Sequence, residues 1–360
     1  MANLRRTGSG FGNPALVLLV GVVVLEGTWV TCRPGLWDAP RSEAAPGSRS
    51  RPAGEGGEES YGAPVWSVAF SADGRYLAWT VLTGEVWLKD RSTGEISRLQ
   101  EGFMSAARAL AFSPDGRVLA VAGGGPKIRL WEIATRSELD ALEVGGEATK
   151  SIAFAPDGIR VAIGQESDGD DRAAVTIWNF ADRRRLAVLA GHRAGVNSLA
   201  FSPDGALLAS GDARGIARLW DMGLPRERTT FRAGDCCIMA VAFSANGRTL
   251  ASCQLGGTVV RLWDTASGRP RGELAAPAGA HTLAFSPDGK WFALGQSEGI
   301  ATLWDRELRR KLGVVRTGGG RVRSLAFSND GEHLAIGDES GGLRLWEVRA
   351  AVASSLEAGG

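Results

Sequence analysis

The chain has 360 residues, of which 44% are hydrophobic, so it is long enough to bury a substantial core. Its formal net charge is +1, which gives no global electrostatic reason to expect binding to nucleic acid or to anionic lipid. Four cysteines are too few for a disulfide-rich scaffold, and without a CxxC or Cys/His cluster they do not suggest zinc.

Residues 1–32 have the pattern of an export or anchoring segment. Arg5 and Arg6 precede an apolar run over residues 15–25, as in a signal sequence. The best cleavage site, "VTC" before Arg33, is poor, so we expect an uncleaved transmembrane signal anchor rather than a cleaved signal peptide. A buried N-terminal strand or helix is the third alternative. Arginine numbers are similar on the two flanks, which leaves the membrane orientation open.

Residues 33–62 are rich in proline, glycine, serine and charge. Few of these side chains could be buried, so we expect a disordered linker that lets a folded head stand off the membrane. This organisation predicts a membrane-anchored protein whose head is extracytoplasmic, with a cytoplasmic head left as the alternative.

From residue 63 to residue 358 the chain repeats one pattern seven times. Each copy has a strand ending in Ala-Phe, a turn such as "SPDG", a second apolar strand, a third strand ending in Trp and a short apolar fourth strand. The Pro, Asp and Gly of the turn favour a tight reversal, so the first two strands form an antiparallel hairpin. The repeated residues are Phe70, Phe112, Phe154, Phe201, Phe243, Phe285 and Phe327, and Trp87, Trp131, Trp178, Trp220, Trp263, Trp304 and Trp346.

This repeat resembles the WD-repeat family, which includes G-protein β subunits. "WD" is literal at Trp220, Trp263 and Trp304, and Trp131 and Trp346 begin "WE". The resemblance implies an all-β fold, a seven-bladed β-propeller of four-stranded antiparallel blades, as a monomeric, bacterial-type stand-alone member of the family. A single blade cannot bury both faces of its sheet, so stacking around the ring supplies the core.

The copies depart from the family in their polar residues. The resemblance implies a hydrogen-bonded tetrad of a Gly-His histidine, a strand Ser, a turn Asp and the Trp. Only His192, Ser210 and Trp220 match it, and we place Arg214 at the turn position. We therefore expect the blades to depend on apolar packing.

Two further expectations concern the ends of the ring and the cysteines. The family often closes its ring with an N-terminal strand, but the residues before Val65 look too polar, so we expect residues 352–358 to complete the last blade. Cys237 and Cys253 lie on neighbouring predicted strands, where they form either a cross-strand disulfide or buried thiols.

One position varies among the copies while its neighbours do not. It lies four residues before each Phe, and strand alternation puts it on the same side as the Phe. The resemblance places it on the top face, around the central opening. Packing fixes the other positions of the repeat but does not constrain this one. We therefore expect this position to form a surface for a protein or peptide partner. This variable column consists of Trp66, Arg108, Lys150, Asn197, Met239, His281 and Arg323.

A second polar position follows the Phe by eleven residues in five copies. The resemblance directs its loop to the top face as well, so we expect it to join the partner-binding rim. A solvated rim without a partner is the alternative. This second ring consists of Gln165, Asp212, Gln254, Gln296 and Asp338.

The third copy carries the largest insertion, "ESDGDD" at residues 166–171. Its clustered carboxylates could bind Ca²⁺, but the loop lacks the length and the terminal Glu of an EF-hand. A contact for a basic partner and a mobile solvated loop are the alternatives, and we expect no metal site.

No catalytic motif is present, and the turn aspartates recur at identical places, as structural residues do. We therefore expect a non-enzymatic protein-interaction scaffold without a cofactor. Basic runs at residues 183–185 and 306–323 lack interleaved aromatics, so we expect no nucleic acid partner.

Two alternatives to this scaffold stay open. The first is a small-ligand-binding or hydrolytic propeller that uses the central channel, with His281, Asp212 and Asp338 as its candidate residues. The second is a cytoplasmic signalling scaffold related to propellers fused to bacterial kinases, which rests on analogy alone.

Overall fold

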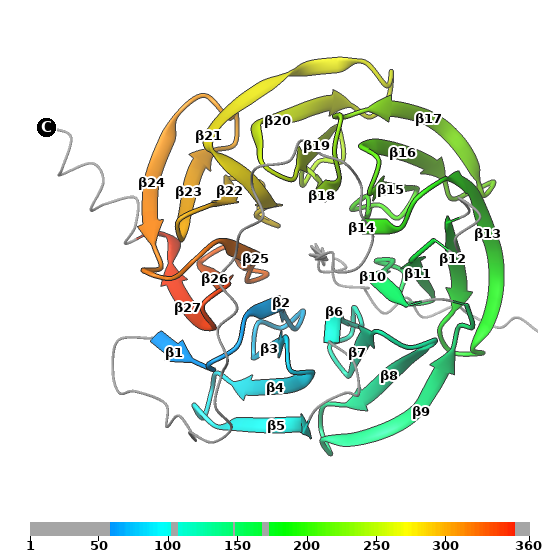
Figure 1. Ribbon diagram of the computed structural model, residues 1–360. Coiled ribbons are helices and arrows are strands. Elements are labelled where there is room, and N and C mark those ends of the chain that lie inside the picture. The colour runs from blue at the N-terminus through cyan, green and yellow to red at the C-terminus, as the bar shows by residue number, and fades with distance from the viewer. Residues whose placement is uncertain (1–57, 102–106, 147, 168–172, 350–360) are drawn as a thin grey trace, which may run out of the picture.

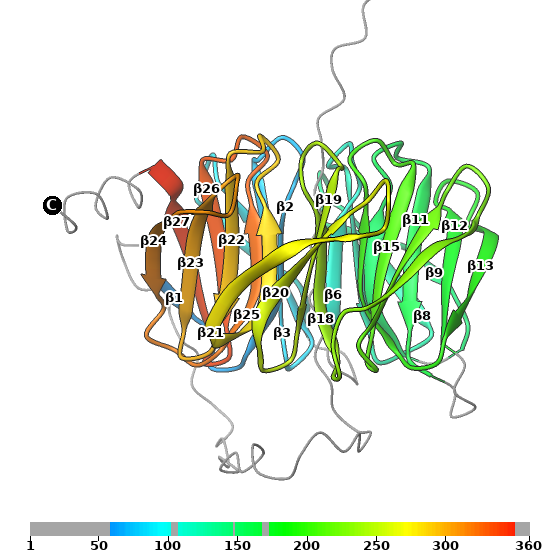
Figure 2. The same ribbon diagram turned by 90° about the horizontal axis from the view of Figure 1, so that it is seen from above.

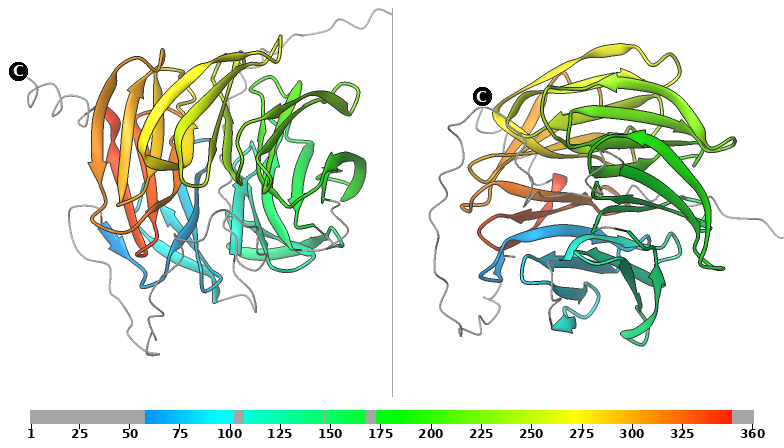
Figure 3. Two further views of the ribbon diagram at one scale, coloured as in Figure 1. Left: turned by 45° about the horizontal axis from the view of Figure 1, so that its top comes forward. Right: turned by 45° about the vertical axis from the view of Figure 1, so that its right-hand side comes forward.

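The computed structural model describes residues 58–101, 107–146, 148–167 and 173–349. Within these ranges the chain forms antiparallel β-sheets arranged around a ring (Figure 1). Seen edge-on, the ring is a thick disc whose strands run across its thickness (Figure 2). Two oblique views show the sheets side by side around the ring (Figure 3). The all-β prediction is therefore confirmed, while residues 1–57 of the expected anchor and linker lie outside the described residues.

The first four sheets follow the repeat with four strands each. Their strands are β2 (Val65–Phe70), β3 (Tyr76–Val81), β4 (Glu85–Asp90) and β5 (Ile96–Glu101); β6 (Ala107–Phe112), β7 (Val118–Gly123), β8 (Lys127–Glu132) and β9 (Ser137–Glu143); β10 (Thr149–Phe154), β11 (Arg160–Gln165), β12 (Ala173–Asn179) and β13 (Arg184–His192); and β14 (Val196–Phe201), β15 (Leu207–Asp212), β16 (Ile216–Asp221) and β17 (Arg226–Arg232).

The next sheet has seven strands because one long strand belongs to two copies of the repeat. Its strands are β18 (Ile238–Phe243), β19 (Thr249–Gln254), β20 (Gly257–Asp264), β21 (Pro270–Phe285), β22 (Trp291–Gln296), β23 (Ile300–Asp305) and β24 (Lys311–Arg316). The first part of β21 pairs with β20 and the last part with β22, and Ala280 is a partner in both pairings. Continuous hydrogen bonding thus joins two copies that the repeat pattern separates.

The last sheet is closed by the N-terminal end of the described chain. It contains β25 (Val322–Phe327), β26 (His333–Asp338) and β27 (Gly342–Glu347), and β1 (Glu58–Ser60) pairs with β27. The expectation that residues 352–358 close the ring is therefore wrong, and those residues lie outside the described ones. An outer edge strand needs backbone partners more than apolar side chains, so the polarity before Val65 did not exclude it.

Side chains anchor β1 to the first sheet as well. Lys89 Nζ lies 2.8 Å from a Glu59 carboxylate oxygen, and the Tyr61 ring lies 5.3 Å from Trp79 and 5.4 Å from Trp87 between centroids. Burial and the neighbouring Glu59 raise the pKa of Tyr61. The end of the expected linker is thus a structural strap across the ring closure.

The first sheet departs from the repeat at its tryptophan. Lys89 pairs with Leu77, the register in which Trp131 pairs with Leu119 in the next sheet. Trp87 lies two residues earlier than the repeat position and stacks on Trp79 at 6.4 Å between ring centroids. The sequence assignment of Trp87 to that position is therefore wrong, and the ion pair between Lys89 and Glu59 explains why a lysine stands there.

The hairpin turns hold the first two strands of each copy in register. In the fourth copy the Ser202 hydroxyl donates to Asp204 at 2.6 Å and accepts the Leu207 N–H at 2.8 Å. The same pair of bonds, to an aspartate and to a backbone N–H, occurs at Ser71, Ser113, Ser286 and Ser328, and at Ser244 the acceptor is Asn246 instead. The aspartates of these turns are therefore structural, as predicted.

The cysteines and the membrane prediction have separate outcomes. Cys253 is a buried free thiol opposite Ala240, so the disulfide with Cys237 is not formed, and burial raises the pKa of Cys253 to about 12. Among the described residues no helix has the length and apolar character needed to cross a membrane.

Candidate protein-interaction rim

The variable column lies where the first strand of each copy begins, at one end of the ring. Most of its members are buried, which corrects the expectation that packing leaves the column free. The exposed fraction is 3% for Trp66, 1% for Lys150, 0% for Asn197, 4% for Met239 and 4% for His281. Only Arg108 and Arg323 keep a modest exposure, at 15% and 12% of their side chains.

The physical reason for this burial is that the column connects neighbouring sheets. Asn197 on β14 donates from Nδ2 to the Ile238 carbonyl of β18 at 3.1 Å. The Arg323 guanidinium on β25 lies over the Trp66 ring on β2, 5.6 Å from its centroid. Because the first strands crowd around the central opening, long side chains at their starts reach the next sheet.

Charge is distributed unevenly along this column. Arg323, Trp66, Arg108 and Lys150 follow one another on the successive strands β25, β2, β6 and β10, and we call these four residues the basic arc. The other column members, Asn197, Met239 and His281, are uncharged at neutral pH, since burial, Arg321 and Arg323 lower the pKa of His281 to about 3. One side of the opening is therefore cationic and aromatic.

Two carboxylates partly neutralise the basic arc. Glu166 pairs with Lys150 and lies 3.7 Å from Arg108 Nη1. Burial lowers the pKa of Lys150, and the Glu166 carboxylate opposes this effect.

Glu339 has a matching position near Arg323. It pairs with Arg323 and lies 3.7 Å from Arg321 Nε. Each carboxylate is thus shared by two cations, so within these two clusters the positive charge exceeds the negative charge.

Like Trp66 at Nε1, Arg108 has side-chain N–H groups that make no hydrogen bond within the described part of the chain. These groups are at its Nε and Nη1 atoms, which are buried. A guanidinium matches a carboxylate geometrically through two N–H groups on the same side. At 15% exposure the Arg108 side chain is the most accessible of the basic arc, so it is the member that an acidic group can reach most readily.

The second ring does not form an exposed rim at its two carboxylates. Asp212 and Asp338 are each 1% exposed. Asp212 Oδ1 accepts the N–H groups of Arg214 and Ile216, and Asp338 Oδ1 accepts those of Ser340 and Gly342. Both aspartates fix the turn into the third strand, so they are unsuited to contact a partner.

Of the three glutamines in the second ring, one is buried and two contact the loop that leads into the first strand of their own copy. Gln296 is 4% exposed, and Gln165 Nε2 donates to the Gly145 carbonyl at 2.5 Å. Gln254 lies so close to Gly234 that a Cβ there would collide with its side-chain oxygen. Gln165 and Gln254 therefore support these loops rather than present their amides to a partner.

Asp212 has a role that the sequence analysis assigned to the wrong position. Its Oδ2 lies 2.9 Å from His192 Nδ1, His192 Nε2 lies 2.6 Å from Ser210 Oγ, and Trp220 Nε1 donates to the same hydroxyl at 2.8 Å. The tetrad is therefore complete in this copy, and Arg214 is not its fourth member. The aspartate of the tetrad lies two residues earlier in the sequence than the position we assigned to it.

The residues proposed for chemistry in the channel do not converge. Asp212 is bonded to His192, Asp338 to its own turn, and His281 Nε2 lies 3.0 Å from Ser297 Oγ. Within the described residues no group of three or more His, Cys, Asp or Glu could hold a metal ion. Of the acidic insertion, Glu166 contacts the basic arc, whereas Asp168, Asp170 and Asp171 lie outside the described residues.

Comparison with known proteins supports the repeat and the fold. The family described as "WD domain, G-beta repeat" matches residues 98–132, 183–221, 226–264, 268–305 and 311–347, just over half of the chain. The chain belongs to the WD40-repeat family. This result confirms the resemblance read from its repeated Phe and Trp residues.

Individual proteins are similar to parts or all of the chain. Small ribosomal subunit protein RACK1y of Oryza sativa subsp. japonica is 29% identical over 102 residues, which span 28% of this chain and 30% of that relative. A solved chain from "Crystal Structure of Mitotic Checkpoint Complex" has a TM-score of 0.74 at 19% identity and covers 90% of this chain and 99% of its own. At this identity the second likeness shows the fold alone.

Proposed function

We propose that this protein is a non-enzymatic protein-interaction scaffold whose partner presents an acidic segment to the basic arc. The observation that carries the proposal is the pair of partly exposed arginines, Arg108 and Arg323, which stand at the opening with the buried Trp66 and Lys150 on neighbouring strands. Arginine is one of the side chains that most often dominate binding energy in protein interfaces. We place the partner's carboxylate on the exposed part of the Arg108 side chain.

The architecture suits such a role. We propose seven blades, because seven strands end in the repeated Phe when the last part of β21 is counted with its own copy. A closed ring of blades offers a preformed surface that moves little on binding. The names of the two similar proteins, a ribosomal subunit protein and a checkpoint complex, refer to assemblies, which agrees with a scaffold.

We further propose that residues 1–32 anchor a monomeric propeller to a membrane and place it on the extracytoplasmic side. The apolar run after Arg5 and Arg6 supports this part of the proposal. Protease treatment of intact cells that carry a C-terminal epitope tag would remove the tag from an exposed head. Survival of the tag, together with cytoplasmic fractionation, would contradict the extracytoplasmic placement.

The docking test uses Arg108 because charge reversal at buried Lys150 would damage the fold. Fluorescence polarisation would measure binding of the full chain to labelled acidic, neutral and basic peptides. We expect preference for acidic peptides and a loss of about tenfold or more for Arg108→Glu, as removal of one charged contact predicts. Arg117→Glu is the matched control, because Arg117 is 84% exposed on a hairpin turn. Equal binding of acidic and basic peptides, or equal losses in both variants, would refute docking on the arc.

A further inference from the structure

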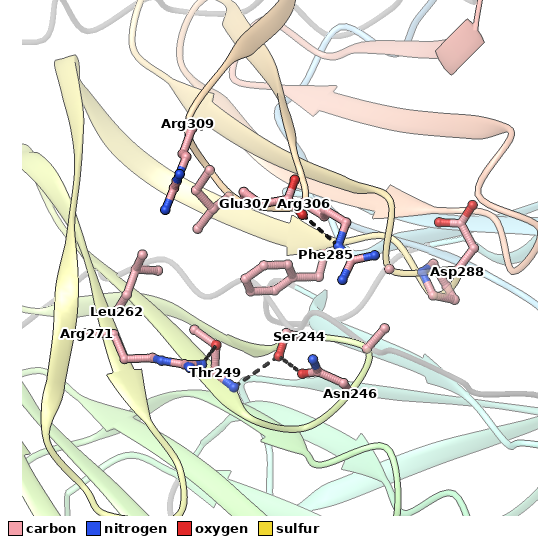
Figure 4. Close-up of a pocket in the computed structure, with 14 residues that line it drawn as sticks. Ser244, Asn246, Thr249, Leu262, Arg271, Phe285, Asp288, Arg306, Glu307 and Arg309 are labelled. Carbon is pink, nitrogen blue, oxygen red and sulfur yellow. Dashed lines mark hydrogen bonds and ion pairs between the residues drawn. The ribbon is translucent and has the colours of Figure 1, made fainter.

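A groove of about 790 Å³ opens between the fifth and sixth copies of the repeat, within the range of about 300–1,000 Å³ seen for ligand pockets. It is formed by the hairpin turns after β18 and β21 and by the turn between β23 and β24. The hairpin turns come after the first strands, whereas the basic arc lies where the first strands begin. The two sites therefore lie on opposite faces of the disc. Figure 4 shows the Phe285 ring at the centre of the groove, between Thr249 and Arg306.

The groove exists because one copy of the repeat lacks a side chain that covers its repeat phenylalanine. We call this covering side chain the plug. The plug position is two residues after the repeat tryptophan, or after Lys89 in the first copy. In six copies its side chain is buried or covers the repeat phenylalanine: Arg91 over Phe70 at 5.3 Å, Ile133 at 3% exposure, Phe180 edge-on to Phe154 at 4.9 Å, Met222 at 5%, Thr265 at 6% and Val348 at 1%. In the sixth copy this position is Arg306, whose side chain is 69% exposed.

The backbone shows the same local opening. In the other six copies the plug residue donates its N–H to a carbonyl of the hairpin turn, as Met222 does to Ala206 at 2.9 Å. Among the described residues Arg306 has no such bond to Lys290. Instead, the Leu308 N–H donates a hydrogen bond to the Asp305 carbonyl within the turn, and Leu308 has a φ of 57°. The open groove is therefore built into this turn.

The lining combines an apolar floor with cations that retain capacity to bind. Phe285, Leu262, Leu308 and Pro287 supply apolar surface. The acidic residues are already paired, since Asp288 Oδ2 lies 2.8 Å from Lys290 Nζ and Glu307 lies 2.9 Å from Arg306.

Two neighbouring arginines add positive charge at the groove. Arg309 lines the groove and Arg310 follows it, both are exposed, and neither makes an ion pair with a described residue. An apolar floor beside spare guanidinium groups favours a ligand that is partly apolar and partly anionic.

We propose that this groove is a second docking surface, which binds a partner-protein segment carrying one large apolar side chain beside acidic residues. The apolar side chain takes the place of the missing plug against Phe285. The acidic residues pair with Arg309 and compete with Glu307 for the exposed Arg306. This site goes beyond the proposed function, because it needs none of the residues of the basic arc.

The test measures binding of the full chain to labelled short peptides with a central Leu flanked by Glu. Two matched peptides separate the two contributions, one with Ser in place of Leu and one with Lys in place of Glu. We expect the Leu-Glu peptide to bind at least about tenfold more tightly than either matched peptide. The Ser peptide loses the apolar contact, and the Lys peptide loses the charged contacts.

Substitutions in the protein then locate the site. Arg306→Val restores the plug found as Val348 in the last copy, so we expect the groove to close and binding to fall about tenfold or more without loss of thermal stability. Arg309→Glu, which leaves the plug position unchanged, should weaken binding as well. Arg226→Glu, an exposed arginine at the start of β17 directly after the corresponding turn of the fourth copy, is the matched control and should change nothing.

Three outcomes would overturn the proposal. Binding that ignores the Leu would indicate charge alone, and binding retained in Arg306→Val but lost in Arg108→Glu would place the peptide on the basic arc. Binding that appears only after residues 350–360 are removed would mean that the chain's own C-terminal segment, with its Leu356 and Glu357, is the natural occupant.

Discussion

At the scale of single residues, position in the repeat does not determine function. Asp212 and Asp338 occupy the same place in two copies, yet only Asp212 bonds to a histidine. A sequence pattern identifies such a position as polar, but the distance to His192 depends on how the preceding loop returns to the sheet. The sequence therefore found three members of the tetrad and misplaced the fourth.

The tetrad predicts unequal costs for two serine substitutions. Ser210 bonds to both His192 and Trp220, whereas Ser252 has one side-chain partner among the described residues, Trp263, whose Nε1 donates to it at 3.1 Å. Each buried partner left unsatisfied costs about 1–3 kcal/mol. We expect Ser210→Ala to lower the free energy of unfolding about twice as much as Ser252→Ala in denaturant titrations. Equal losses in the free energy of unfolding would show that the hydrogen bond between His192 and Ser210 does not stabilise the fold.

His281 predicts a pH dependence of stability. Its folded pKa is about 3 and its unfolded value is 6.5, because the residue is buried near Arg321 and Arg323. The unfolded chain therefore binds a proton in this window that the folded chain does not. The stabilising effect of neutral His281 is present above about pH 6.5 and is lost as pH falls toward about pH 3.

The measurement for His281 compares melting temperatures of the wild-type chain and His281→Gln from about pH 7 to about pH 4. Other titrating groups act equally in both proteins, so the difference isolates this residue. We expect the wild-type chain to lose more stability on acidification, by up to a few kcal/mol. Parallel loss in the two proteins would contradict the assigned cause.

At the scale of elements, the repeat predicted hairpins and four-stranded sheets well, because turn chemistry and strand alternation are local properties. It failed where partners are distant in sequence. The pairing of β1 with β27 and the contact of Lys89 with Glu59 join residues that no local pattern relates. The expectation that packing leaves the variable column free was wrong for the same reason, since the burial of its members depends on the neighbouring sheet.

The strap formed by β1 and Tyr61 predicts a sharp boundary for truncation. A chain that begins at residue 58 keeps the strap, and we expect its folded part to melt like that of the full protein. A chain that begins at residue 63 loses β1 and the Tyr61 contacts with Trp79 and Trp87. Loss of a fully buried aromatic side chain costs about 3–5 kcal/mol, and Tyr61 is half-buried, so its loss together with the β1 pairing should lower the melting temperature of this second chain. Similar melting of both chains would mean that the closure adds no stability.

At the scale of the whole molecule, the ring was predictable and its asymmetry was not. Repetition of Phe and Trp at regular spacing defines a closed stack of sheets. The differences among copies concentrate charge on the basic arc at one end and open a groove at the other. Both depend on single substitutions, such as Arg306 at the plug position, whose effect appears only when equivalent positions are compared in space.

The closing strand also imposes an order on biosynthesis. β1 leaves the ribosome first, but its partner β27 belongs to the last copy of the repeat. At about 5–20 residues per second, the interval between them is on the order of tens of seconds. During that interval Trp79 and Trp87 lack the cover of a completed ring, and a chain that stops early never acquires it. The ring of sheets can therefore close only after the last copy of the repeat has been translated, when β27 becomes available to pair with β1.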